Sequence, residues 1–173
     1  MMKWLMRIVI ALVVIGAAVV LVGYALPEKH TASRTAHLSQ PPERVWATMT
    51  DFAGYPGWRT DVETVEQLPP QDGKPAWREI SHRGSRINYA VETWDPPRHL
   101  VVRITDRDLP FGGSWDYALA PSGTGSTITI TEHGEIYNPV FRVMLRFMSK
   151  TGTIDSYLAA LAAKLGDPYT PRG

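Results

Sequence analysis

The chain has 173 residues, of which 44% are hydrophobic and 20% are charged, and this composition excludes a disordered or fibrous protein. It contains no cysteine, which excludes disulfide bonds, thiolate metal sites and a cysteine nucleophile. The 18 basic and 17 acidic residues give a formal net charge of +1. Because nucleic-acid-binding domains usually carry a clearly basic face, this balance predicts no nucleic-acid partner.

An uncharged apolar run from Ile8 to Leu26 predicts a membrane-spanning helix, so residues 1–26 are expected to form an N-terminal anchor. At about 1.5 Å per residue the run extends roughly 28 Å, close to the ~30 Å hydrocarbon core of a bilayer. A cleaved signal peptide is the alternative, although the run exceeds the usual ~7–15 residues of such a peptide. Lys3 and Arg7 precede the run, which favours a single-pass protein with its domain outside the cytoplasm.

The remainder divides into a linker at 27–33, a domain at 34–166 and a tail at 167–173. A first strand is expected at 34–39, and a short helix begins at Pro42 because proline suits a first helical position. Short runs rich in β-branched and aromatic residues, separated by proline and glycine, then predict six strands. These strands cover 62–68, 77–82, 87–94, 100–105, 112–119 and 128–137.

A long final helix is predicted from Pro139 to Leu165, with Asn138 as its N-cap and Gly166 beyond its end. Apolar residues recur every three or four positions along it, as one buried helix face requires. Consecutive strands with short connections predict an antiparallel sheet, which must bury one face against this helix. The fold class is therefore α+β, with a curved sheet around a C-terminal helix.

Several stretches resemble the helix-grip fold of the START-like, or SRPBCC, superfamily, and more narrowly its polyketide cyclase/dehydrase and lipid transport branch. The resemblance spans roughly residues 31–166. It implies a deep apolar and aromatic cavity between the sheet and the last helix. The matching stretches are residues 41–58, 92–104, 111–119, 131–147 and 154–166.

Alternation along the predicted strands gives candidate cavity residues on the inward faces, and two methionines on the helix complete the set. Methionine adapts its shape, which suits a pocket for variable apolar ligands. Ordinary core packing is the alternative for each of them. The candidates are Tyr89, Val91, Trp115, Tyr117, Ile128, Ile130, Met144 and Met148.

Glu132 is the most suggestive polar candidate, because strand alternation points it inward. A carboxyl group in an apolar cavity has a raised pKa and is suited to general acid–base catalysis. The alternative is an ion pair with Arg142 or Arg103. His133 and Glu135 fall on the opposite face and would need a further ligand to hold a metal, so no metal or cofactor is predicted.

These features predict a membrane-anchored domain that binds a small hydrophobic or lipid-like molecule, with Glu132 as its one polar orienting group. Its partners would be that molecule and, through residues 8–26, a membrane. The alternative is a cyclase- or dehydratase-type enzyme that uses Glu132 as acid or base. The sequence favours it less, since it contains no nucleophile elbow, zinc-binding pair or phosphate loop. A third hypothesis is an accessory protein with a closed pocket.

Overall fold

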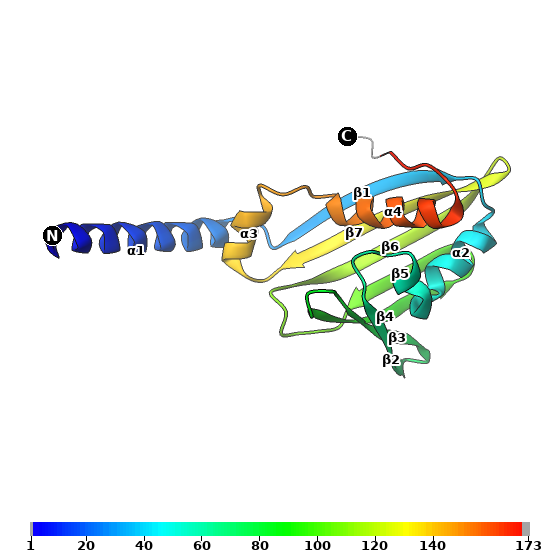
Figure 1. Ribbon diagram of the computed structural model, residues 1–173, viewed down its shortest axis with the longest axis horizontal. Helices are drawn as coiled ribbons and strands as arrows, with labels where there is room; N and C mark the ends of the chain where they lie inside the picture. The colour runs from blue at the N-terminus through cyan, green and yellow to red at the C-terminus, as the bar shows by residue number, and fades with distance from the viewer. Residues whose placement is uncertain (1, 171–173) are drawn as a thin grey trace.

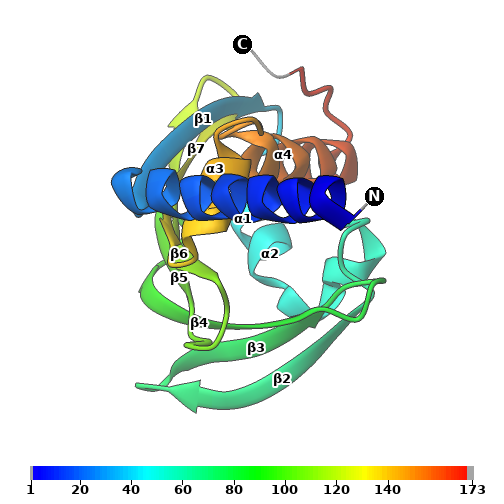
Figure 2. The same ribbon diagram turned by 90° about the vertical axis from the view of Figure 1, so that its left-hand side faces the viewer.

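The computed structural model describes residues 2–170, and a seven-stranded antiparallel sheet curves around the helices that cover its inner face (Figures 1 and 2). The strands follow the order β1-β7-β6-β5-β4-β3-β2. They are β1 (Lys29–Leu38), β2 (Thr64–Gln71), β3 (Lys74–Ile80), β4 (Arg86–Asp95), β5 (His99–Ile104), β6 (Phe111–Ser122) and β7 (Gly125–Ile136). The helices are α1 (Met2–Ala25), α2 (Pro42–Thr50), the 3₁₀ helix η1 (Phe52–Gly57), α3 (Pro139–Leu145) and α4 (Gly152–Leu165).

The predicted order of one strand, one helix and six further strands is confirmed, as is the helix-grip fold class. The first strand differs from expectation because it begins at Lys29, inside the segment expected to be a linker. It pairs residue by residue with β7, from Lys29 opposite Glu135 to Leu38 opposite Ser126. The early start pairs the backbone of residues 29–33 with β7, whereas in a free linker these N–H and C=O groups would bind water.

The prediction of one unbroken helix from Pro139 to Leu165 is wrong, because residues 146–151 separate α3 from α4. The Thr151 hydroxyl donates to Asp155 at 2.9 Å and accepts from Arg34 of β1 at 2.9 Å. These bonds tie the start of α4 to the sheet edge. The three- and four-residue spacing of apolar side chains continues through the break, so periodicity alone could not reveal it.

The apolar face in the second half of the predicted helix does belong to the core, since Ile154, Leu158 and Leu161 are at most 1% exposed. At the other end, the Asn138 side chain accepts from the first backbone N–H groups of α3, as predicted. Gly166 ends α4 with a φ of 83°, a left-handed conformation that favours glycine.

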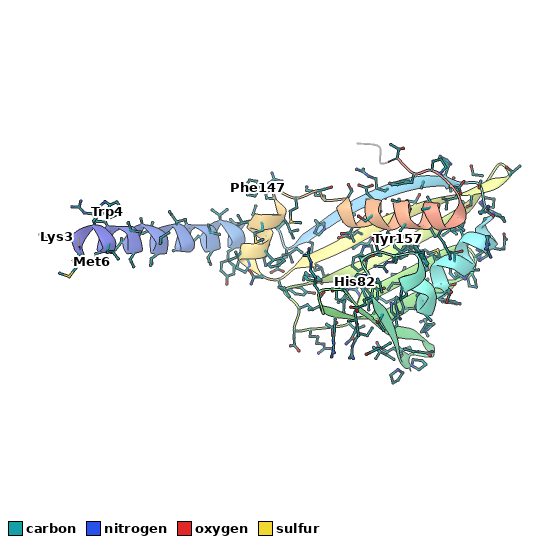
Figure 3. All side chains as sticks on the ribbon, in the orientation of Figure 1. Lys3, Trp4, Met6, His82, Phe147 and Tyr157 are labelled. Carbon is teal, nitrogen blue, oxygen red and sulfur yellow. The ribbon has the colours of Figure 1, made fainter. Side chains whose placement is uncertain are left out.

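Helix α1 projects away from the domain, with Lys3 and Trp4 at its remote end (Figures 1 and 3). An 18-residue stretch of this 24-residue helix is strongly apolar, and none of it is buried against the domain. The helix is thus long and apolar enough to cross a membrane, as an anchor or a signal sequence would be.

The C-terminal end of α1 packs closely against α3. Gly23 is buried there, and a Cβ atom at this position would lie 2.1 Å from the Pro139 carbonyl oxygen, so only glycine fits. The nearby Arg142 guanidinium is 7% exposed and donates to the backbone oxygens of Ile136 at 2.8 Å and of Gly23 and Leu26 at 3.4 Å each. Arg142 thereby links the C-terminal end of α1 to the end of β7.

Candidate functional site

Two adjoining cavities of about 510 and 370 Å³ lie between the sheet and the segment that carries α3 and α4. Strands β3 to β7 supply one wall, and residues from Met148 to Tyr157 supply the other wall of the larger cavity. The residues that border both cavities are Arg59, Asp61, Glu79, Tyr89, Trp115 and Thr153. The volumes are in the range of small-molecule sites.

Aromatic side chains form a continuous wall along the inner face of the sheet. Trp77 and Tyr89 occupy opposing positions on β3 and β4, and their rings stack with centroids 5.5 Å apart. Phe52 of η1 stacks on the other face of this group, 3.8 Å from Trp77. The Trp115 ring lies 6.1 Å from Tyr89 and extends the wall across the sheet. Such pairs favour a well-ordered apolar surface.

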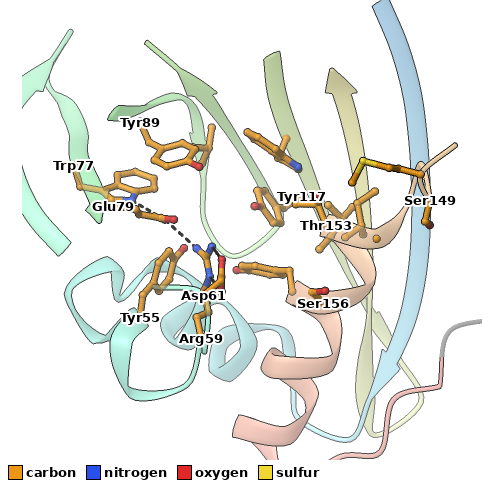
Figure 4. Close-up of a pocket in the computed structure, with 17 residues that line it drawn as sticks. Tyr55, Arg59, Asp61, Trp77, Glu79, Tyr89, Tyr117, Ser149, Thr153 and Ser156 are labelled. Carbon is orange, nitrogen blue, oxygen red and sulfur yellow. Dashed lines mark hydrogen bonds and ion pairs between the residues drawn. The ribbon is translucent and has the colours of Figure 1, made fainter. Parts of the chain in front are cut away.

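A buried ion pair stands beside this wall (Figure 4). Arg59 donates to Glu79 at 2.9 Å and to Asp61 at 2.6 Å, and the Trp77 indole N–H donates to the same Glu79 oxygen at 3.1 Å. The Arg59 and Glu79 side chains are only 14% and 10% exposed, whereas Asp61 reaches solvent. The Arg59 guanidinium also lies 4.9 Å from the Tyr55 ring centroid.

Burial raises the pKa of Glu79, although the Arg59 guanidinium opposes this shift. For Arg59, burial lowers the pKa, but the Glu79 and Asp61 carboxylates outweigh it and the net pKa is raised. Burial also raises the pKa of the surrounding tyrosines, so their hydroxyl groups keep their protons at neutral pH. These are Tyr55, Tyr89, Tyr117 and Tyr157.

Two of the tyrosine hydroxyls are available to a ligand. Tyr55 donates to the Met49 carbonyl at 2.8 Å, which fixes its ring. Tyr89 and Tyr117 line the larger cavity, and within residues 2–170 their hydroxyls have no hydrogen-bond partner. A hydroxyl both donates and accepts, so these two groups can bind a hydroxyl or carbonyl group of a guest.

Glu132 lies on the inner face, as expected, and borders the smaller cavity. The alternative interpretation, an ion pair with Arg142 or Arg103, is wrong, because Arg142 pairs with Glu28 and Arg103 with Glu92. Glu132 instead accepts from the Trp115 indole at 3.2 Å and lies 3.4 Å from His30.

A glycine makes room for the His30 ring. Gly134 lies opposite His30, and a Cβ atom there would come within 2.0 Å of the imidazole. On the far side of β7, His133 is exposed, while Glu135 accepts from Tyr137 at 2.7 Å. Among residues 2–170, no three metal-ligating side chains converge.

The structure brings most of the other sequence candidates to the cavities. Trp115 and Tyr89 border both of them, while Tyr117, Ile130 and Met148 border the larger one. The remaining three lie elsewhere: Val91 and Ile128 belong to the packed core at 4% and 0% exposure, and Met144 on α3 is 53% exposed and borders neither cavity.

The sequence analysis missed the Arg59–Glu79 pair and Tyr157. One signal was available, because Trp77 and Glu79 are two apart on one strand and so share its inner face. Tyr157 follows Ile154 by three residues and therefore lies beside the buried stripe of α4. Nothing in the local pattern marks Arg59, which comes from an irregular segment after η1.

Comparison with solved structures gives similar folds at low sequence identity. A START superfamily protein from Mycobacterium smegmatis has a TM-score of 0.65 at 16% identity, covering 79% of this chain and 97% of that one. The Zhui aromatase/cyclase from a Streptomyces species gives 0.64 at 16%, covering 80% and 94%. Norcoclaurine synthase from Thalictrum flavum gives 0.62 at 13%, covering 79% and 94%.

A search of curated protein sequences found no match. The family model described as polyketide cyclase/dehydrase and lipid transport matches residues 29–166, from the first strand to the end of α4. This span includes both walls of the two cavities. The chain therefore belongs to the polyketide cyclase/dehydrase and lipid transport family.

Proposed function

We propose that this protein is a membrane-anchored domain that binds a small, neutral, amphiphilic molecule in the two adjoining cavities. The observation that carries the proposal is the combination of an aromatic wall with a few polar groups at one place. An apolar guest gains about 25 cal/mol per Å² of buried surface before ordering costs. Cavities that orient such a guest with few polar groups are typical ligand sites.

The charges in the site favour a neutral guest over an anionic one. Within residues 2–170, Arg59 is the one arginine or lysine that borders the cavities, and two carboxylates already pair with it. An anionic head group that displaced Glu79 from Arg59 would leave a buried carboxylate unpaired, which is costly. The free hydroxyls of Tyr89 and Tyr117 instead suit an alcohol or ketone group.

The anchor part of the proposal is supported by the joint between α1 and the domain. Cleavage after a signal sequence would remove Gly23 from its buried contact and take away two acceptors of Arg142. An anchored domain would also meet lipid-soluble ligands at a raised local concentration. Intact-mass measurement of the membrane-extracted protein checks this, with retention of residues 1–26 as the expected result.

Photolabelling with a long-chain fatty alcohol that carries a diazirine in its chain tests ligand binding. The full chain is reconstituted in lipid nanodiscs, irradiated and mapped by peptide mass spectrometry. We expect labels on β6 and on the start of α4. Thr153→Trp, which fills the boundary of both cavities, should abolish most of this labelling. Thr124→Trp, in the exposed turn between β6 and β7, is the matched control.

Labelling confined to α1, or labelling of the domain that Thr153→Trp leaves unchanged, would contradict the binding proposal. A fatty acid of equal length should label the domain less than the alcohol does. Equal or stronger labelling by the acid would contradict the preference for a neutral head group.

Proton-transfer catalysis is a second candidate, favoured by the position of two carboxyl groups at the cavities. Burial raises the pKa of Glu79, and Glu132 borders the smaller cavity. A carboxylate there could remove an acidic C–H proton from a dicarbonyl guest. Hydrogen–deuterium exchange of a long-chain β-diketone tests this. Loss of exchange in Glu132→Gln or Glu79→Gln supports catalysis, and unchanged exchange together with retained photolabelling supports binding alone.

A further inference from the structure

Exposed apolar side chains outside α1 are concentrated in one short segment. Five of the seven large ones within residues 2–170 fall between positions 140 and 148. Phe147 is 86% exposed, Met148 60% and Met144 53%, and Val140 and Phe141 are also exposed. Such an apolar patch on a folded domain usually marks an interaction site.

The same segment is basic. Its charged residues are Arg142, Arg146 and Lys150, and no acidic residue occurs between Asn138 and Ile154. Arg142 is buried in the joint with α1, whereas Arg146 and Lys150 are exposed. Apolar and basic side chains together are typical of segments that lie at the surface of an anionic bilayer. Residues 139–150 are named the interfacial segment here.

The joint with α1 determines where this segment lies. Gly23 contacts Pro139 at the first residue of the segment, three residues before the apolar run of α1 ends. In both ribbon views α3 runs across the direction of α1 (Figures 1 and 2). Phe147 (Figure 3) lies in the loop that follows α3, and α3 itself packs against α1. A bilayer that contains α1 along its normal therefore has α3 along its surface.

We propose that the interfacial segment docks on the anionic surface of the same membrane that α1 spans. This inference rests on the proposed role of α1 as an anchor. The segment also borders the cavities, with Met148 at the larger one and Phe141 and Leu145 at the smaller one. Docking thus turns this rim of the ligand site towards lipid, so that an apolar guest passes between bilayer and cavity without crossing bulk water.

Single-cysteine labelling of the full chain tests the inference directly, because the sequence contains no cysteine. An NBD fluorophore is attached at Phe147→Cys, at Val14→Cys in the middle of α1, and at Thr124→Cys in the remote β6–β7 turn. The proteins are reconstituted in nanodiscs of phosphatidylcholine with phosphatidylglycerol, with and without doxyl-labelled lipids. We expect blue-shifted emission and strong doxyl quenching at positions 14 and 147, and neither at position 124.

Charge reversal then tests the anionic partner. Each basic residue near an anionic surface favours docking by roughly fivefold, so Arg146→Glu with Lys150→Glu should shift position 147 strongly towards water. Arg78→Glu, on the exposed face of β3, is the control that should leave quenching unchanged. Pure phosphatidylcholine nanodiscs should also reduce quenching at position 147.

The outcomes separate the two proposals. Quenching at position 14 with a water-exposed label at position 147 overturns the docking of the interfacial segment and leaves the anchor intact. Quenching at position 147 that neither charge reversal nor lipid charge alters overturns the anionic surface as the partner. Absence of quenching at position 14 overturns the anchor, and with it the inference.

Discussion

Removal of the Arg59 side-chain charge should lower the free energy of unfolding, because the buried Glu79 carboxylate loses its partner. Arg59→Met keeps much of the apolar stem but leaves Glu79, which is 10% exposed, without its cation. Breaking a buried pair in this way costs about 3–5 kcal/mol. Glu79 retains the 3.1 Å bond from Trp77, so we expect a loss near the lower limit, about 3 kcal/mol at pH 8.

The loss should depend on pH. The pKa of Glu79 is already raised above its ordinary value of 4.5, so the folded state binds more protons than the unfolded state. The free energy of unfolding therefore falls as the pH rises from the unfolded-state pKa to the folded-state pKa of Glu79. Without Arg59 the folded-state pKa of Glu79 rises further, so the pH range over which the protein loses stability extends to higher pH. Thermal unfolding in detergent should therefore show a smaller loss at pH 5 than at pH 8.

Two variants check the cause. Arg59→Met combined with Glu79→Gln should recover much of the stability, because no buried charge remains. Arg78→Met, on the same strand as Glu79 but paired with the half-exposed Glu66, should cost about 1 kcal/mol or less. Equal losses for Arg59→Met at both pH values, or no recovery in the double variant, would refute the reasoning.

Three further predictions concern the helices around the site. Leu158→Ala should lower the free energy of unfolding by about 2–5 kcal/mol, because Leu158 is 1% exposed, and a loss below ~1 kcal/mol in chemical denaturation would contradict its place in the core. Asn138→Ala should cost about 1 kcal/mol by removing the cap of α3, and unchanged unfolding would show the cap to be dispensable. Gly23→Leu should separate α1 from α3 and speed tryptic cleavage at Arg142. Gly16→Leu is the control and should not change the cleavage rate, because no atom lies within 4 Å of a Cβ at that position. Equal cleavage in both variants would disprove the close contact at Gly23.

Strand periodicity was sufficient for the sheet and for much of the aromatic wall. Tyr89, Trp115 and Tyr117 alternate with outward residues, and antiparallel pairing then brings their side chains to one face. The same rule cannot say whether an inward residue meets a cavity or a neighbour. Val91 and Ile128 share that inner face but are packed in the core, and strand alternation does not distinguish the two environments.

Local sequence patterns could not predict the polar part of the site or the break before α4. Arg59 reaches Glu79 from twenty positions away through an irregular segment, so only the tertiary fold brings them together. At the break in the last helix, Thr151 accepts a hydrogen bond from Arg34 on β1, again a long-range contact. Met144 was assigned to the cavity as part of one continuous helix, but it lies on α3, before the break.

We propose above all that the space between the sheet and α4 holds an apolar guest. Native mass spectrometry of the full chain, extracted from its membranes in nanodiscs, measures this most directly. We expect one bound neutral, hydrophobic molecule per chain, reproducible between preparations and absent from the Thr153→Trp variant. Wild-type protein that repeatedly carries no such molecule and also fails to retain the photoreactive alcohol would contradict it.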